Sequence, residues 1–405
     1  MIQKPSTAIV IGAGIAGCST AYALAKRGIM VTLIDRNRHI AQEASGNPVG
    51  MLYPKFSTGP SVLSTIAKHG FTYTLSLLKE LSVTQEMYDL CGQIQLASTL
   101  REKDKQSKLL AKQNRENYFQ LLTAKEASKI ANIALNHGGL YIAESGWVKP
   151  QLFCQALIQS HSITKLMATS ALHVKQREDC WQVKLQKNST LEADIIVLAN
   201  ANDIVQFEQC KNIPITPVRG QVNFFKMNAF SHELKTILCT DHYLSPSVDG
   251  YHSIGTSYAP HDMNAMLSAV DTRTNINALK AMSPDLYNEV DINQVTGRVA
   301  WRSATRDYIP LAGQLINANQ LKKEPPRYND KPADLPWLKG LYLNAGHGSK
   351  GLITAPLCGE LIANLVNQEP LAINSSIAST MNPSRFALRQ MGLKKIAQNL
   401  YDFLD

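Results

Sequence analysis

The feature that most constrains this chain is a glycine-rich turn close to its N-terminus. Residues 8–11 form a short apolar run, and I-G-A-G-I-A-G at 11–17 leads directly into a run of small residues that suits a helix. A second apolar run, residues 30–34, ends at Asp35. This order predicts a strand, a helix and a second strand within about 30 residues, which is a βαβ unit.

The glycines of this turn fit a phosphate-binding site. Gly12 permits the tight turn from strand to helix, Gly14 lets the backbone approach a pyrophosphate, and Gly17 lets the helix pack close to the strand. The amides and the dipole at the helix N-terminus favour a phosphate there. A carboxylate at Asp35 can accept hydrogen bonds from ribose hydroxyls. The segment therefore predicts a dinucleotide site.

Length and charge narrow the other possibilities. The 405 residues allow two or three domains, and 44% hydrophobic with 18% charged residues is an ordinary globular composition. Lys and Arg number 41 against 32 Asp and Glu, which gives a net charge of +9. Such an excess suits a polyanionic partner, such as nucleic acid or an anionic membrane surface, but it also suits a general solvated surface.

The cysteines and the apolar runs indicate a cytoplasmic protein. The seven cysteines include no C-x-x-C pair, which argues against a disulfide framework or a zinc site and favours a reducing compartment. No apolar run approaches about 18 residues, and the N-terminus lacks the features of a signal peptide. We therefore expect no metal and no transmembrane helix.

A second glycine-rich strand, turn and helix are predicted near the other end of the chain. In G-L-Y-L-N-A-G-H-G-S-K-G-L-I-T-A-P at 340–356, a buried strand runs into three spaced glycines and then a helix. After Asp35, regular βα units do not follow, because the loop E-A-S-G-N-P-V-G-M-L-Y-P occupies 43–54. Two cradles of backbone amides at opposite chain ends favour FAD over NAD as the cofactor.

These motifs resemble the FAD-dependent amine and amino-acid oxidoreductases, the family of D-amino acid oxidase, glycine oxidase and sarcosine oxidase. The resemblance also rests on A-N-A at 199–201, P-V-R-G-Q at 217–221 and W-R-S-A-T-R-D-Y-I-P at 301–310. It implies a Rossmann-like α/β FAD-binding domain in separate segments, with an inserted α+β substrate domain on a mainly antiparallel sheet. We assign 1–60, 140–215 and 337–405 to the former, and 61–139 and 216–336 to the latter.

One branch of this family is especially similar. The segments 44–54, 348–361 and 382–386 (N-P-S-R-F) resemble the FAD-dependent oxidoreductase domain of the bifunctional tRNA 5-methylaminomethyl-2-thiouridine biosynthesis protein, in which Arg commonly stands in place of Lys350. That protein carries a methyltransferase domain before the oxidoreductase domain. This chain starts at the FAD fingerprint, so we expect no methyl transfer here, and a separate methyltransferase is a possible partner.

The resemblance implies non-covalent FAD, because residues 297–313 contain no Cys where some relatives attach the flavin. The implied cofactor-binding residues are Gly12, Gly14, Ile15, Ala16, Gly17, Asp35, Arg36, Ala44, Ser45, Gly46, Asn47, Gly50, Met51, Val174, Ala199, Asn200, Gly346, His347, Gly348, Ser349, Lys350, Gly351 and Leu352.

The implied substrate is a tRNA whose wobble uridine carries a 5-carboxymethylaminomethyl group, with or without 2-thiolation. Hydride transfer from the glycine α-carbon to the flavin gives an imine, and water then releases glyoxylate and leaves the 5-aminomethyl group. One alternative is an oxidase or dehydrogenase of glycine, sarcosine or a D-amino acid, which needs no basic surface around its pocket. Another is a flavoprotein or RNA-binding scaffold without turnover, which would be expected to lose the second glycine cradle.

The substrate carboxylate needs a cation, and a guanidinium can hold it through two parallel hydrogen bonds. Arg302 is the first candidate from the family motif, Lys350 the second and Arg219 the third, and for each the alternative is a structural ion pair. A neutral amine requires no general base, so His347 is expected to position the flavin or backbone. Three tyrosines are either pocket or sheet residues: Tyr243, Tyr251 and Tyr258.

A tRNA partner requires Lys and Arg contacts with its phosphates. Residues 101–128 have a charged helical pattern, and a second basic group lies near the C-terminus; either is also compatible with a solvated helix face. The two groups are Lys103, Lys105, Lys108, Lys112 and Arg115, and Arg385, Arg389, Lys394 and Lys395.

Overall fold

The computed structural model describes residues 5–54, 56–59, 61–81, 86–113, 118–327 and 329–402. Its first sheet has six strands, of which five are parallel to one another and one strand at the edge is antiparallel. The order is β9 (Ile163–Leu166), β2 (Met30–Ile34), β1 (Thr7–Ile11), β13 (Ile195–Leu198), β21 (Trp337–Ala345) and β20 (Leu311–Ile316). This sheet confirms the predicted Rossmann-like α/β architecture.

Different elements cover the two faces of this sheet, because successive side chains of a strand point in opposite directions. Ala8 and Val10 of β1 belong to the core on the helical face, whereas Ile9 and Ile11 pack toward a three-stranded sheet. The helices of the first face are α1 (Ile15–Ala25), α2 (Val62–Glu80), α5 (Pro150–Leu157) and α10 (Gly351–Asn367). The three-stranded sheet consists of β10 (Ala171–Gln176), β11 (Trp181–Leu185) and β12 (Thr190–Ala193).

The second large sheet is mainly antiparallel, as predicted, and has nine strands. Helices α4 (Ala124–Ala131), α6 (Ala269–Asn277), α7 (Leu279–Met282) and α8 (Pro284–Asn288) share its hydrophobic core. The strands are β18 (Ala259–Pro260), β14 (Ile215–Lys226), β17 (Tyr251–Gly255), β16 (Tyr243–Leu244), β15 (Ile237–Cys239), β5 (Gln93–Leu96), β7 (Gly139–Ile142) and β6 (Gln120–Leu122) in order, with β19 (Thr296–Thr305) paired to β14.

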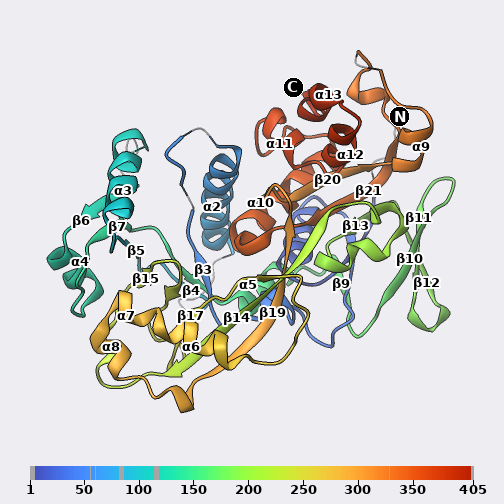
Figure 1. Cartoon of the computed structure of the whole chain (residues 1–405). Coiled ribbons are helices and arrows are strands. Elements are labelled where there is room, and N and C mark those ends of the chain that lie inside the picture. The colour runs from blue at the N-terminus through green and yellow to red at the C-terminus, as the bar shows by residue number, and fades with distance from the viewer. Residues whose placement is uncertain are drawn as a thin grey trace.

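Smaller elements complete the described chain. A three-stranded sheet joins the two large units, a longer helix lies beside β6 and β7, and short helices lie around the C-terminal part of the chain (Figure 1). The sheet consists of β3 (Gly50–Leu52), β4 (Tyr88–Asp89) and β8 (Gly146–Val148), the longer helix is α3 (Leu100–Gln113), and the short helices are α9 (Ala318–Lys323), α11 (Ser375–Met381), α12 (Arg385–Gln390) and α13 (Lys394–Gln398).

The structure departs from several sequence expectations. The continuous helical pattern over 101–128 is wrong, because α3 is followed by β6, which pairs with β7, and then by α4. Helix α2 packs on α10 in the core of the six-stranded sheet, although 61–139 was grouped with the substrate unit. In the same way β20 belongs to the six-stranded sheet, and β7 to the nine-stranded sheet. These three elements belong to the sheet or core of the strands and helices that they contact, and not to the unit of their neighbours in sequence.

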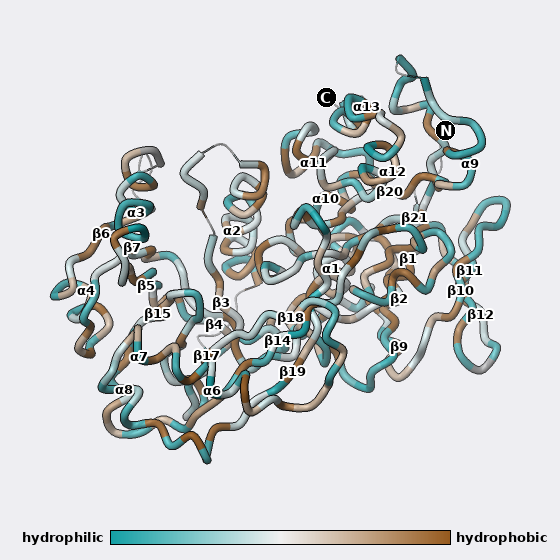
Figure 2. The backbone as a smooth tube through the Cα atoms, in the orientation of Figure 1, coloured by the Kyte–Doolittle hydropathy of each residue, from teal (hydrophilic) through white to brown (hydrophobic). Residues whose placement is uncertain are grey.

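The distribution of hydropathy agrees with this layering. Figure 2 shows hydrophobic residues along β1 and hydrophilic residues in the loops of the β10–β12 sheet. In the part of the chain that the structure describes, no helix has the length and apolar character that crossing a membrane requires. The same described residues contain no cluster of His, Cys, Asp and Glu suited to a metal ion.

Candidate active site

The turn from β1 into α1 is built around a very close backbone approach. A Cβ atom on Gly17 would lie 1.6 Å from the carbonyl oxygen of Gly12, so only glycine permits this contact. Gly12 has a φ of 107°, a conformation that residues with a Cβ rarely adopt. The first turn of α1 therefore presents backbone amides that have no partner within the helix beside the end of β1, which is the geometry of an anion site.

Asp35 fixes this turn from the end of β2. One carboxylate oxygen, Oδ2, accepts a hydrogen bond from the Ala13 amide at 2.7 Å, and Oδ1 accepts one from the Asn37 amide at 2.7 Å. Asp35 thus orders the glycine turn, in addition to the ribose contact expected of it. The neighbouring Arg36 is exposed and pairs with Glu43 and Asp203.

Four segments that are distant in sequence meet at this turn. The Ser45 hydroxyl accepts a hydrogen bond from the Ile15 amide at 3.0 Å, which ties the 44–47 loop to α1. The Cβ position of Gly12 lies 2.6 Å from the Ala199 oxygen, and that of Gly351 lies 3.4 Å from the Ile15 side chain. The two predicted glycine cradles are therefore adjacent, as one extended cofactor requires.

The fit to FAD is supported by two buried polar atoms that have no hydrogen-bond partner among the described residues, Asn200 Oδ1 and His347 Nε2. Burial lowers the pKa of His347 to about 3, so its ring is neutral. The Thr354 hydroxyl donates to the Lys350 carbonyl and so accepts from His347 Nδ1 at 2.9 Å. The Nε2 atom is then left as an acceptor, which suits an N–H group of a bound ligand.

Arg302 lies in β19 and is half-buried. Its guanidinium donates to the Thr256 hydroxyl and, at 3.4 Å, to the Ser257 carbonyl, while it faces the Tyr258 ring at 6.0 Å. Burial lowers its pKa, and the ionisable groups that act on it are the tyrosines Tyr53, Tyr243 and Tyr258. Within the described chain, no Asp or Glu forms an ion pair with Arg302. A buried cation without an anion is costly, and a substrate carboxylate would neutralise it.

Gly220 makes room for this guanidinium, although the sequence analysis did not identify it. A Cβ at Gly220 would lie 2.6 Å from both Arg302 Nη atoms. Gly220 is part of the P-V-R-G-Q motif at 217–221, but the motif alone does not distinguish its role from that of the adjacent arginine. Tyr53 was missed as well, since it lies in the flavin loop segment; burial raises its pKa to about 12, so it remains a neutral phenol.

Arg219, the third cation candidate, has a structural partner instead. It is buried, forms an ion pair with Asp271, and donates to the carbonyls of Asn264 and Met266, both at 2.7 Å. In the β14–β19 register Arg219 lies opposite Trp301, whereas Arg302 lies opposite Val218. Its guanidinium holds the 262–271 segment in place, and we do not retain it as a substrate ligand.

Arg298 is a further residue that the sequence analysis missed. Its guanidinium donates to Asn47 Oδ1 at 2.8 Å and to the carbonyls of Gln42 and Glu43 at 3.0 Å. Arg298 thereby anchors the 42–47 loop to β19, and Gly46 lies directly beneath it. Arg298 lies outside the family motif at 301–310. Its partners lie about 250 positions away in the sequence, so no local pattern indicates its role.

The other predicted residues are distributed as follows. Lys350 is half-buried at the start of α10, Ser349 is exposed, and Met51 lies in β3. Val174 lies in β10 and packs into the core between the sheets. Gly50 contacts Leu352 from the opposite segment. Ala16, Ala44, Gly346 and Gly348 lie in the segments already described.

Two of the predicted phosphate-binding cations are engaged within the fold. Arg385 is fully buried and pairs with Asp307 at 2.9 Å, and Arg389 contacts the same carboxylate at 3.1 Å. Arg385 cannot contribute to an RNA-binding surface, so this part of the prediction is wrong. Lys394 and Lys395 are exposed, as are Lys103 and Lys105. Arg115 and the side chain of Lys112 lie outside the described residues.

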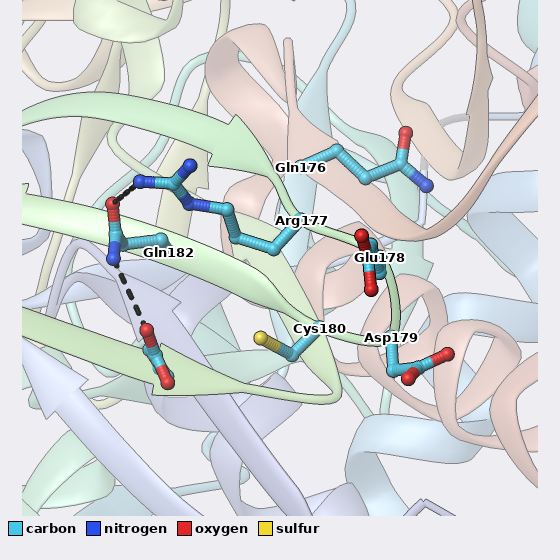
Figure 3. Close-up of a pocket in the computed structure, with 7 residues that line it drawn as sticks. Gln176, Arg177, Glu178, Asp179, Cys180 and Gln182 are labelled. Atoms are coloured by element: carbon cyan, nitrogen blue, oxygen red, sulfur yellow. Dashed lines mark hydrogen bonds between the residues drawn. The ribbon is translucent and has the colours of Figure 1, made fainter.

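A separate hollow of about 850 Å³ lies at the turn between β10 and β11 (Figure 3). In it Arg177 donates to Gln182, and Gln182 donates to Glu192, both at 3.1 Å. The hollow belongs to one small sheet and contains none of the glycine-loop residues, so we do not assign the chemistry to it. Its lining residues are Gln176, Arg177, Glu178, Asp179, Cys180, Gln182 and Glu192.

Comparisons with known proteins agree with this site. The family model described as FAD dependent oxidoreductase matches residues 7–365. The tRNA 5-methylaminomethyl-2-thiouridine biosynthesis bifunctional protein MnmC of Methylobacillus flagellatus is 38% identical over 399 residues, which are 98% of this chain and 62% of that protein. The protein of the same name from Pseudomonas putida F1 is 37% identical and is covered to 61%. The chain thus spans about three fifths of the length of these curated relatives.

Solved structures show the same fold. Glycine oxidase from Geobacillus kaustophilus has a TM-score of 0.77 at 22% identity, with 94% of this chain and 98% of that chain covered. L-proline dehydrogenase from P. horikoshii has a TM-score of 0.75 at 18% identity, with 96% and 99% covered. The chain therefore belongs to the FAD-dependent oxidoreductase family of the D-amino acid oxidase type, and it is an FAD-dependent oxidoreductase.

Proposed function

We propose that this enzyme oxidises the carboxymethylaminomethyl group on the wobble uridine of tRNA, releasing glyoxylate and leaving a 5-aminomethyl group. The observation that carries the proposal is the half-buried guanidinium of Arg302, which has no carboxylate partner in the described chain. The substrate offers the missing anion, because its reacting carbon lies between a secondary amine and a carboxylate.

The residues around Arg302 account for binding of the carboxylate end of the substrate. Arg302 binds the carboxylate and so orients the adjacent CH2 group, while Thr256 and the Ser257 carbonyl fix the guanidinium itself. Tyr53 and Tyr243 are half-buried phenols whose pKa values burial raises, and their rings limit the access of water to the cation, which strengthens the ion pair. A flavin held by the two glycine loops supplies the hydride acceptor.

On the substrate side, the reaction consumes only one water molecule. The CH2 carbon loses a hydride and the amine nitrogen loses a proton, which gives an imine between nitrogen and carbon. Water then adds to this carbon, and cleavage of the carbon–nitrogen bond yields glyoxylate and a primary amine. No side chain needs to remove a proton from carbon, so Arg302 acts by binding and orientation.

Two observations support tRNA as the carrier of this group. The formal net charge of +9 suits a polyanion, and the relatives of 37–38% identity are named for tRNA 5-methylaminomethyl-2-thiouridine biosynthesis. Lys350, half-buried at the second glycine loop, is proposed as a second cation of the site. A separate methyltransferase is the proposed consumer of the primary amine.

The test compares substrates on the flavin-loaded protein. We expect kcat/KM for tRNA carrying the carboxymethylaminomethyl group to exceed that for glycine, sarcosine and D-alanine by at least about 100-fold, and nucleoside analysis to show the 5-aminomethyl product. Tyr251→Ala serves as a surface control. Efficient oxidation of the small amines with no change in the tRNA nucleoside would refute the proposal and establish a small-molecule oxidase.

A further inference from the structure

Two exposed tyrosines border Arg302. Tyr258 is 53% exposed and its ring lies over the guanidinium, and Tyr308 is 66% exposed. Burial and the neighbouring Tyr308 raise the pKa of Tyr258, so the two hydroxyl groups lie near one another. The pair therefore forms an aromatic surface beside the cation that we assign to the substrate carboxylate.

Tyr308 has an unusual backbone conformation. Its φ is 58°, in the left-handed region that residues other than glycine seldom adopt. Burial does not explain this conformation, because the ring faces solvent. Residues kept in such conformations tend to cluster at functional sites, where the surrounding structure holds them.

An ion pair and two hydrogen bonds fix the backbone of the turn that carries Tyr308. Asp307 pairs with the buried Arg385, the Ile309 amide donates to Asp307 at 3.2 Å, and the Thr305 hydroxyl donates to the Ile309 carbonyl at 2.8 Å. The position of the exposed ring is thus set by buried contacts. Arg385, the residue that was wrongly expected on an RNA-binding surface, supports this turn instead.

Arg306 adds a cation to the same turn. Its side chain is exposed, and it makes no hydrogen bond or ion pair with the described part of the chain. An exposed cation beside exposed aromatic rings is a combination that binds single-stranded nucleic acid, because the rings stack on bases and the cation contacts a phosphate.

We propose that Tyr258 and Tyr308 stack on the nucleobases that flank the modified uridine in the anticodon loop, and that Arg306 contacts a phosphate of the same loop. This inference rests on the proposed function, since Arg302 receives the carboxylate of the nucleotide between those bases. Unpaired loop bases are the part of an RNA that proteins commonly recognise by aromatic stacking. The net charge of +9 favours the same polyanionic partner over a protein surface.

The test measures binding of a fluorescent anticodon stem-loop to the full, flavin-loaded chain by anisotropy. The main variant is Tyr308→Gly, because glycine suits the left-handed backbone and removes the ring without adding strain. Tyr308→Phe keeps the ring and removes the hydroxyl. We expect affinity to fall about 5- to 150-fold in Tyr308→Gly and to remain near that of the unaltered protein in Tyr308→Phe.

A matched control and a salt series make the test specific. Tyr251 is also an exposed tyrosine, but in β17 it lies opposite Lys226, eight residues along β14 from Val218, which pairs with Arg302. That offset is about 26 Å at about 3.3 Å per residue. Tyr251→Ala should bind like the unaltered protein. Arg306→Ala should reduce the slope of log K against log salt by about 0.7.

The outcomes separate the two proposals. If Tyr308→Gly binds the stem-loop as tightly as the unaltered protein while that protein still converts modified tRNA, the stacking surface is refuted and the proposed reaction stands. If binding depends on Tyr308 but the tRNA nucleoside is never converted, the proposed reaction is refuted and the RNA surface stands. An equal loss in Tyr251→Ala would show a nonspecific surface effect and would also refute the stacking assignment.

Discussion

Arg302 is half-buried and Arg385 is fully buried, and the two arginines have opposite electrostatic environments, so exchanging each for methionine separates function from stability. Arg385 is paired with Asp307 and also donates to the Ile309 carbonyl at 2.8 Å. Arg302 has no carboxylate partner within the described chain. Methionine retains much of the apolar volume of each side chain and removes the charge.

The expected magnitudes follow from these contacts. Breaking the Arg385 pair leaves a carboxylate and carbonyls without their donors, so Arg385→Met should cost about 3 kcal/mol in the free energy of unfolding. Arg302→Met removes a half-buried cation that has no anion among the described residues, so the same free energy should stay constant or rise by about 1 kcal/mol. Loss of a desolvated carboxylate contact is worth about 2–5 kcal/mol, which lowers kcat/KM about 30- to 5,000-fold.

Urea unfolding and tRNA turnover of the two variants, each loaded with FAD, provide the assay. Flavin absorbance should persist in Arg302→Met, because the guanidinium is not required to hold the two glycine loops together. The reasoning fails if Arg302→Met loses as much stability as Arg385→Met, or if its kcat/KM stays within threefold of the unaltered enzyme.

Three further predictions concern the cofactor loops. Gly17→Ala should abolish FAD retention on gel filtration, because its Cβ would lie 1.6 Å from the Gly12 oxygen; FAD binding equal to that of the unaltered protein would contradict the geometry. Arg298→Met should weaken FAD binding about tenfold or more by releasing Asn47 and the 42–47 loop, as measured by fluorescence titration, and an unchanged Kd would argue against this anchor. His347, whose pKa burial lowers from 6.5 to about 3, is neutral in the fold but takes up a proton on unfolding, so the free energy of unfolding should fall as pH decreases from about 6.5 toward 3. His347→Gln should flatten that dependence, and identical pH profiles would exclude the residue as its source.

The sequence was most informative where function depends on local backbone geometry. The first βαβ unit and the second glycine loop could be predicted because glycines, an apolar strand and a terminal carboxylate occur within short windows. The Rossmann-like fold with a second, mainly antiparallel sheet, which the family resemblance implied, is confirmed as well. The long charged pattern over 101–128 wrongly predicted helical structure throughout, because the strand at Gln120–Leu122 depends on its pairing with β7 rather than on its own composition.

The roles of the arginines could not be read from spacing alone. Arg219 and Arg302 both occur in motifs of the family. Arg219, however, is paired with Asp271, 52 residues away, and donates hydrogen bonds to the carbonyls of Asn264 and Met266. Arg385 looked like part of a basic surface until its contact with Asp307 showed that it is buried. Gly220 gained a role only when the register placed the Arg302 guanidinium over it.

The most direct test of the central proposal is anaerobic mixing of the FAD-loaded enzyme with tRNA carrying the carboxymethylaminomethyl group. The proposal predicts bleaching of the oxidised flavin absorbance, about one glyoxylate per flavin, and a matching amount of the 5-aminomethyl nucleoside, with Arg302→Met strongly slowed. Persistence of the flavin absorbance and of the original nucleoside, under conditions in which sarcosine or glycine reduces the same flavin, would contradict it.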